Sequence, residues 1–195
     1  FFGLEDAWVE TAPGELTHYH ELGEGTPVVF LHGSGSGVSA AANWWLNLPE
    51  LSKHCRTIAV DLLGFGQTIE APDSEFGIKA WVEHVVRILD ALGIEKTWLV
   101  GNSLGGWVAC QFAIDHPERL AGIISMGTGG APRTKALASH AKPKMTPDGI
   151  RQALLDFVVD PSLVSEELVN SRYAAASREG ATERFRAVVA ARDID

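Results

Sequence analysis

A short motif in the middle of the chain places a sharp turn between a strand and a helix. Residues 97–100 form an apolar run, residues 101–105 read GNSLG, and residues 106–115 have the composition of a helix. Small residues around Ser103 allow a strained turn that holds one hydroxyl above a sheet. The backbone N–H of Leu104 would then point at whatever that hydroxyl attacks. We therefore expect a fold organised around Ser103 as a catalytic nucleophile.

Short apolar runs alternate with helical patterns through the first two thirds of the chain. Residues 78–92 carry apolar side chains at helical spacing, and Gly93 supplies a stop. Residues 8–10 and 16–21 predict an opening antiparallel hairpin. Four further runs are typical of strands buried on both faces of a parallel sheet: 27–31, 57–61, 97–100 and 120–126. The expected fold class is α/β, a mostly parallel sheet with flanking helices.

The alternation stops after residue 126, and the remainder reads as helical. The predicted helices are 147–159, 165–176 and 182–191, with Ser165 at a helix start. We expect an α/β core over residues 1–134 and a helical cap over residues 135–195, placed above the carboxyl edge of the sheet.

Composition excludes several classes of function. The formal net charge of −9, with no Lys/Arg stripe, disfavours a nucleic-acid partner. No apolar run approaches the roughly 18–20 residues of a membrane-spanning helix. Cys55 and Cys110 fit reduced thiols packed in a cytoplasmic protein, rather than a disulfide framework.

A glycine-rich loop, HGSGSG at residues 32–37, follows the predicted strand 27–31. With the strand, turn and helix around Ser103 it resembles the α/β-hydrolases, in which two backbone N–H groups stabilise an oxyanion. We assign these donors to Ser34 and Leu104. A phosphate cradle is disfavoured because the loop has neither the P-loop spacing nor a lysine. No cofactor and no metal site are predicted.

The general base is harder to find. In α/β-hydrolases the histidine follows the nucleophile and the acid along the chain. Only His116 and His140 follow Ser103, and neither is in a loop after a last core strand, so neither is assigned. His32 is interpreted as structural. Four histidines are predicted to be exposed, without metal-ligand spacing: His18, His20, His54 and His84.

Four segments resemble the meta-cleavage product hydrolases, the α/β-hydrolase branch that cuts carbon–carbon bonds in ring-fission products of aromatic degradation. They are LHGSGSGV at 31–38, ANW at 42–44, VGNSLGG at 100–106, and the cap stretch 162–173. The resemblance implies a small-molecule substrate of the 2-hydroxy-6-oxo-hexa-2,4-dienoate type. In that family the dienol becomes its keto tautomer before water cleaves the bond beside the distal ketone. Direct serine attack and activation of water both stay open.

The resemblance also implies substrate-binding residues. Arg172 would hold the carboxylate in its planar fork. Asn43 and Asn102 would orient the dienoate, and Gly33 and Gly35 of the glycine-rich loop would lie against it. From the residues alone, a solvated cap arginine and two turn asparagines are the favoured interpretation, and the family pattern reverses this preference.

Judged by this resemblance, the chain stops at Asp195 where the cap of the family ends. The triad acid and histidine would lie beyond that point, and Asp193 and Asp195 are not assigned as the acid. We expect a piece of a longer hydrolase, nearly inactive by itself, with an exposed apolar sheet edge that favours a homo-oligomer. Two alternatives stay open: a serine esterase on the same scaffold, and a non-catalytic ligand-binding module.

Overall fold

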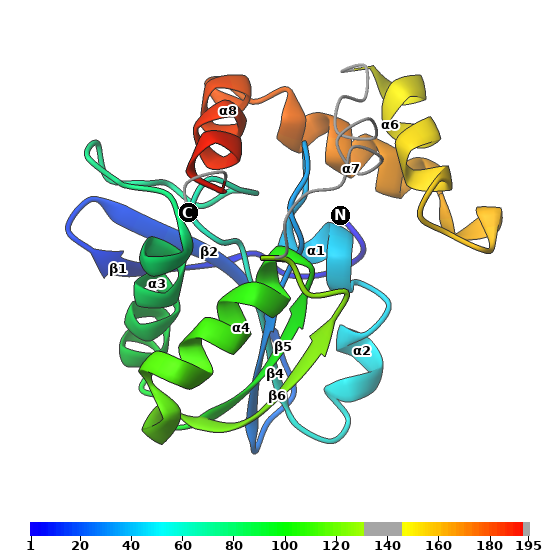
Figure 1. The fold of residues 1–195 in the computed structure, drawn as a ribbon. Coiled ribbons are helices and arrows are strands. Elements are labelled where there is room, and N and C mark those ends of the chain that lie inside the picture. Colours follow the sequence, from blue (N-terminus) through cyan, green and yellow to red (C-terminus); the bar gives the residue numbers. More distant parts are fainter. Residues whose placement is uncertain (131–145, 193–195) are drawn as a thin grey trace.

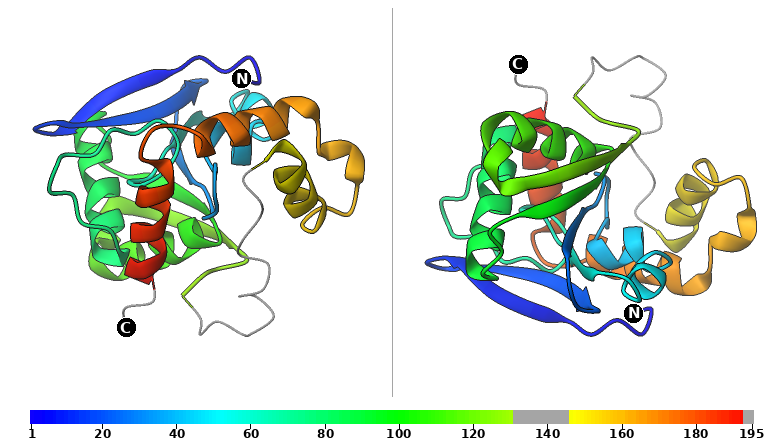
Figure 2. Two further views of the ribbon diagram at one scale, coloured as in Figure 1. Left: turned by 90° about the horizontal axis from the view of Figure 1, so that it is seen from above. Right: turned by 90° about the horizontal axis from the view of Figure 1, so that it is seen from below.

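The structure, a computed structural model, describes residues 1–130 and 146–192. These residues form one six-stranded sheet with helices on both faces (Figures 1 and 2). The strand order is β1-β2-β4-β3-β5-β6. The strands are β1 (Ala7–Ala12), β2 (Glu15–Leu22), β3 (Pro27–Leu31), β4 (Arg56–Val60), β5 (Thr97–Asn102) and β6 (Leu120–Met126).

The sheet is antiparallel at one side and parallel at the other. β1 pairs with β2 and β2 with β4 in antiparallel register, so the predicted hairpin is confirmed. β4, β3, β5 and β6 are parallel neighbours, which confirms the predicted α/β class. The carboxyl ends of parallel strands meet at one edge, where ligands bind in open α/β sheets.

Helices cover the two faces of the sheet and bury one core on each (Figure 2). They are α1 (Ala40–Trp44), α2 (Leu48–Leu51), α3 (Ile78–Ala91) and α4 (Leu104–Asp115), with a short 3-10 turn, η1 (Pro117–Arg119). Leu31 packs on the α3 and α4 side with Trp81, whereas Phe30 packs on the α1 and α2 side with Trp44. This alternation is the two-residue period of a strand covered on both faces.

The last part of the chain lies above the carboxyl edge of the sheet (Figure 1). It contains α6 (Pro147–Leu155), the 3-10 turn η2 (Pro161–Leu163), α7 (Glu166–Ala176) and α8 (Ala181–Arg192). The side chain of Ser165 accepts a hydrogen bond from the Leu168 N–H, which confirms the predicted helix start. α6 ends earlier than the predicted residue 159. The predicted boundary between residues 134 and 135 falls outside the described residues.

These helices are held in two ways. Ile150, Val164 and Val169 form a small core of their own, while Val188 of α8 is fully buried and belongs to the core on the α3 and α4 side. None of the described helices combines the length and apolarity that crossing a bilayer requires. Cys55 and Cys110 are free thiols, both partly buried.

The prediction for β6 was wrong in part. Its residues were expected to be buried on both faces, yet Ile123, Ile124 and Met126 are 37%, 52% and 41% exposed. β6 pairs only with β5 among the described strands, and α4 packs against it. The apolar edge expected at this strand is therefore present.

Three of the four histidines predicted to be exposed are buried. His18, His20 and His84 are 1%, 3% and 0% exposed, whereas His54 is exposed as expected. The error has a topological cause. β2 lies between β1 and β4, and side chains next to it cover His18: Asp6 and Trp8 at β1, and Asp61 after β4. The corresponding polar side chain of α3, His84, faces the sheet and shares a hydrogen bond with Thr17 at 2.7 Å.

Because His84 is buried, the free energy of unfolding depends on pH. Burial, together with the charge of Arg87, lowers the pKa of His84 to about 3. The unfolded chain binds a proton at this histidine below about pH 6.5, while the folded chain does not until about pH 3. Between these values His84 therefore reduces the free energy of unfolding by about 1.4 kcal/mol for each unit of falling pH.

We predict that His84→Gln flattens the pH dependence of the unfolding free energy between pH 6 and pH 4.5. Urea unfolding at several pH values measures this slope, and His54→Gln is the matched control because His54 is exposed. Equal slopes for His84→Gln and the unchanged protein would contradict the assignment of a neutral buried imidazole.

Candidate active site

Ser103 lies on a strained turn between β5 and α4. Its φ is +52°, a left-handed value that serine rarely adopts. The flanking glycines are required by close packing. A Cβ atom on Gly101 would lie 2.3 Å from the Gly105 carbonyl oxygen, and one on Gly105 would lie 2.2 Å from the Leu31 carbonyl oxygen. The strained turn predicted from the motif is therefore confirmed.

Backbone hydrogen bonds fix Ser103 from neighbouring elements. Its N–H donates to the Met126 carbonyl at the end of β6 at 2.8 Å. Its carbonyl accepts from the N–H of Trp107, one turn into α4, at 3.1 Å and from the N–H of Gly129 at 2.8 Å. The nucleophile candidate is thus held by rigid elements, as a catalytic group requires.

The glycine-rich loop is joined directly to the turn at Ser103. The Gly105 N–H donates to the His32 carbonyl at 3.1 Å, so the loop after β3 meets the first turn of α4. Among the backbone hydrogen bonds of residues 1–130 and 146–192, none uses the Leu104 N–H. That donor sits at the positive end of the α4 dipole. The arrangement supports Leu104 and the adjacent loop residue Ser34 as oxyanion donors, and this assignment stays a prediction.

Two asparagines and one glycine surround the nucleophile. Asn43 Oδ1 accepts from the Gly33 N–H and from Asn102 Nδ2, both at 3.1 Å. A Cβ atom on Gly33 would lie 3.4 Å from Ser103 Cβ and 3.2 Å from Asn102 Nδ2. Four of the residues singled out from the sequence are therefore brought together: Gly33, Asn43, Asn102 and Ser103.

Arg172 reaches the same loop from α7. Its Nη2 donates to the Ser36 carbonyl at 3.0 Å. Nη2 also packs closely on Gly35, because a Cβ atom added to that glycine would lie 3.3 Å from Nη2. The Nε–H is buried and has no hydrogen-bond partner. Burial lowers the pKa of Arg172 to about 10, so the group still carries its charge at pH 7. No salt bridge within the described parts of the chain involves it.

A largely buried cation is costly unless an anion pairs with it, and among the described residues no carboxylate pairs with Arg172. Ser103 and Arg172 contact the same loop two residues apart. Gly33 lies beside Ser103, and Gly35 lies beside Arg172. An extended chain covers at most about 7 Å over two residues. Ser103 and the Arg172 guanidinium therefore lie along one short stretch of the glycine-rich loop.

Asp61 holds the start of α1 and the segment after β4, and sequence reasoning missed it. This fully buried carboxylate follows β4 and accepts from the Ala40 N–H at 2.6 Å and the Gln67 N–H at 2.8 Å. Burial would raise its pKa, but hydrogen bonding and the charge of His18 hold the pKa of Asp61 below its ordinary value. An aspartate directly after a buried strand and before a glycine-rich segment was the available signal.

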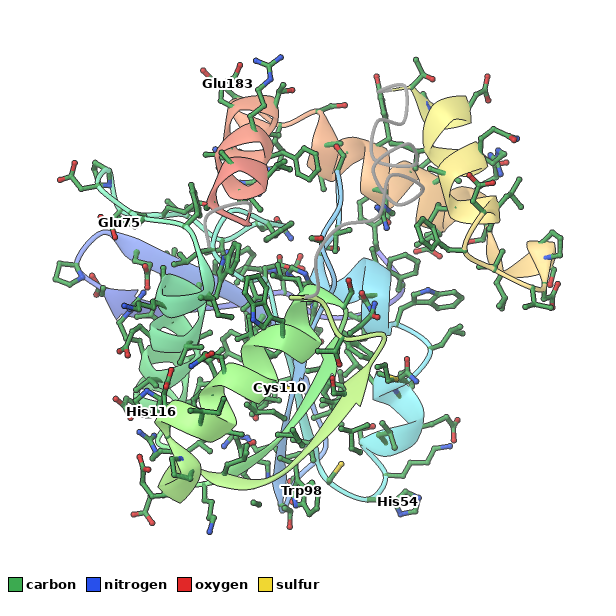
Figure 3. All side chains as sticks on the ribbon, viewed as in Figure 1. His54, Glu75, Trp98, Cys110, His116 and Glu183 are labelled. Atoms are coloured by element: carbon green, nitrogen blue, oxygen red, sulfur yellow. The ribbon has the colours of Figure 1, made fainter. Side chains whose placement is uncertain are left out.

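The histidines of the described residues do not reach Ser103. His32 uses both ring nitrogens, with Nδ1 donating to the Gly33 carbonyl at 2.6 Å and Nε2 accepting from the Leu62 N–H at 3.1 Å. This matches its interpretation as structural. His116 lies at the opposite end of α4 from Ser103, which excludes it as the base (Figure 3). His140 lies outside the described residues.

Comparison with known proteins gives concordant findings. A family model described as alpha/beta hydrolase fold matches residues 26–191. The chain is 43% identical over 179 residues to 2-hydroxymuconate semialdehyde hydrolase of a Pseudomonas strain, covering 91% of the chain and 63% of that protein. It is 42% identical over 176 residues to 2-hydroxy-6-oxo-2,4-heptadienoate hydrolase of Pseudomonas putida, covering 89% of the chain and 64% of that protein.

The solved structures agree. A serine-to-alanine variant of the meta-cleavage product hydrolase from Pseudomonas fluorescens, complexed with acetates, is 40% identical with a TM-score of 0.82. That likeness covers 93% of the chain and 67% of the solved one. The chain spans a little under two thirds of the length of the two curated relatives.

Proposed function

Because the chain belongs to the meta-cleavage product hydrolases of the α/β-hydrolase family, we propose that it carries the nucleophile of a carbon–carbon bond hydrolase. The proposed substrate class is the 2-hydroxy-6-oxo-2,4-dienoates produced by ring fission of aromatic compounds. Two curated relatives are hydrolases whose names give substrates of this kind. The proposal concerns the whole protein that contains these residues.

The observation that carries the proposal is Arg172, whose Nε–H is buried without a hydrogen-bond partner. A dienoate presents a carboxylate beside an enol or keto oxygen, and a guanidinium binds a carboxylate through two parallel hydrogen bonds. The unpartnered Nε–H of Arg172 supplies one of those donors without breaking its bond to the Ser36 carbonyl. With the carboxylate at Arg172, the distal ketone of the same molecule lies toward Ser103.

The residues around Ser103 then attack the ketone, stabilise the oxyanion and orient the substrate. The Ser103 hydroxyl attacks the ketone or positions the water that does, and the Leu104 and Ser34 N–H groups stabilise the oxyanion that forms. Asn43 and Asn102 hold the glycine-rich loop in register and orient the dienoate between the two ends. Gly33 and Gly35 have no side chain, which lets Asn102 and Arg172 approach the loop closely.

Proton transfer needs a base near Ser103, and the histidines of the described residues do not provide it. We therefore expect residues 1–195 by themselves to retain only the slow turnover that binding and oxyanion stabilisation supply. The full reading frame is the form to assay.

The proposal is tested by comparing two substrates with the protein expressed from the full reading frame. One is 2-hydroxy-6-oxo-hepta-2,4-dienoate, and the other is a neutral ester of similar size. A charge-assisted pair contributes about 1.5–3 kcal/mol, so we expect kcat/KM to favour the dienoate by roughly 10–150-fold from this contact alone. A preference for the neutral ester would instead support the serine esterase alternative.

A further inference from the structure

Three side chains with metal-binding groups converge far from Ser103 in the sequence. Asp6 precedes β1, and His18 and His20 lie on one face of β2 because they are two residues apart. Each offers one ligand atom, and the three atoms lie within 4.8 Å of one another. The two histidines are buried, whereas the Asp6 side chain is 46% exposed. An ion would therefore enter from the Asp6 side.

The His18 ring is oriented as in metal-binding histidines, with Nε2 toward Asp6, whereas the His20 nitrogen nearest to Asp6 is Nδ1. His18 Nδ1 is hydrogen-bonded to Asp61 Oδ2 at 2.6 Å, and His20 Nδ1 to the Glu5 carbonyl at 2.7 Å. When Nδ1 donates to a carboxylate or a backbone carbonyl, the Nε2 lone pair is left for a metal, and the ligand becomes more basic. Both histidines have such a partner, one of each kind.

The distance between His18 Nε2 and Asp6 Oδ1 suits a small tetrahedral ion, whereas His20 must move closer, because its nitrogen nearest to Asp6 Oδ1 is Nδ1 at 3.8 Å. Zinc–nitrogen and zinc–oxygen bonds of about 2.0–2.2 Å place neighbouring ligand atoms about 3.3 Å apart. His18 Nε2 and Asp6 Oδ1 are 3.0 Å apart. The side-chain amide of Gln67 lies 3.3 Å from His18 Nε2 and 3.4 Å from Asp6 Oδ1. Rotating this amide presents its oxygen as a fourth ligand.

We propose that Asp6, His18 and His20 form a structural site for a divalent transition metal of the zinc class, with Gln67 or water completing the coordination. Two imidazoles and one carboxylate are a donor set that zinc accepts. Binding releases the proton that His18 Nε2 shares with Asp6. Through Asp61, which also holds the Ala40 N–H, the ion would fix α1 beside the glycine-rich loop.

The competing account is an imidazolium at His18 that bridges Asp6 and Asp61 without metal. Titration of the tag-free, full-reading-frame protein with Co²⁺ and Zn²⁺ separates the two. We expect one equivalent of Co²⁺ to give a visible d–d band without sulfur-to-cobalt charge transfer, and Zn²⁺ to displace it. Such a spectrum excludes Cys55 and Cys110 as the ligands.

Matched variants assign the residues. Asp6→Asn keeps the volume of a half-exposed side chain, and we expect it to weaken Zn²⁺ binding at least tenfold. His20→Gln should do the same, while His54→Gln on the exposed surface should bind as the unchanged protein does. Zn²⁺ should also raise the thermal unfolding midpoint of the unchanged protein but not that of Asp6→Asn.

The proposal is overturned if the unchanged protein binds no stoichiometric metal at pH 7.5, or if Asp6→Asn binds it equally well. Should either variant fail to fold, the cobalt spectrum of the unchanged protein decides, because a charge-transfer band or the absence of any band rules out this site. These readouts do not involve turnover and are independent of the proposed hydrolase activity.

Discussion

Replacing Ser103 by alanine in the protein expressed from the full reading frame lowers kcat for a dienoate by about 10⁴–10⁶-fold. The expected size follows from the loss of the group that attacks or positions water, while the oxyanion donors and Arg172 remain. Stopped-flow or steady-state loss of the dienol chromophore measures it. Binding of the substrate should survive, since the anchor for its carboxylate is untouched.

The serine at the cap of α7, Ser177, provides the matched control. It is exposed, and its replacement by alanine should leave kcat unchanged. Alanine tolerates the left-handed φ of position 103 no better than serine, so the fold of Ser103→Ala should be checked by circular dichroism. A folded Ser103→Ala protein with more than a tenth of the original kcat would contradict the nucleophile assignment.

The second large effect is expected at Arg172. Arg172→Gln keeps a hydrogen-bonding amide but removes the charge, and we expect kcat/KM for the dienoate to fall by roughly 10–150-fold. The same variant should hydrolyse a neutral ester at an unchanged rate, because the ester has no carboxylate to anchor. The ratio of the two kcat/KM values is therefore the quantity to report.

Arg178→Gln is the control for this prediction. Arg178 is exposed and also donates to a loop carbonyl, that of Gly66, but it is not one of the residues around Ser103. Its replacement should alter neither kcat/KM. An equal loss on the dienoate and the ester in Arg172→Gln would mean that the arginine only supports the cap, and the esterase alternative would then gain ground. Loss of binding without chemistry would favour the ligand-binding module.

Local signals predicted the central part of the site well. The GNSLG motif specifies its own geometry, because only glycine fits at two of its positions. Gly101 packs against the Gly105 carbonyl, and Gly105 packs against the Leu31 carbonyl. Ser165 as a helix start and the alternating strands and helices were likewise readable, since each depends on neighbours a few residues away.

The rest depended on contacts between distant segments. The burial of His18 and His20 follows from the insertion of β2 between β1 and β4, a pairing with no signature in the hairpin itself. The unpartnered Nε–H of Arg172 exists only because α7 folds back onto the loop after β3. Asp61 is likewise recognised only from its hydrogen bonds to Ala40, Gln67 and His18, because the sequence does not show that these residues lie beside it.

The most direct test of the central claim is product analysis in water labelled with ¹⁸O. The full-reading-frame protein is incubated with 2-hydroxy-6-oxo-hepta-2,4-dienoate, and the products are identified by mass spectrometry. We predict a shorter 2-hydroxydienoate together with acetate that carries one labelled oxygen, formed with the unchanged protein and not with Ser103→Ala. Recovery of intact dienoate from the folded, unchanged protein would contradict the account.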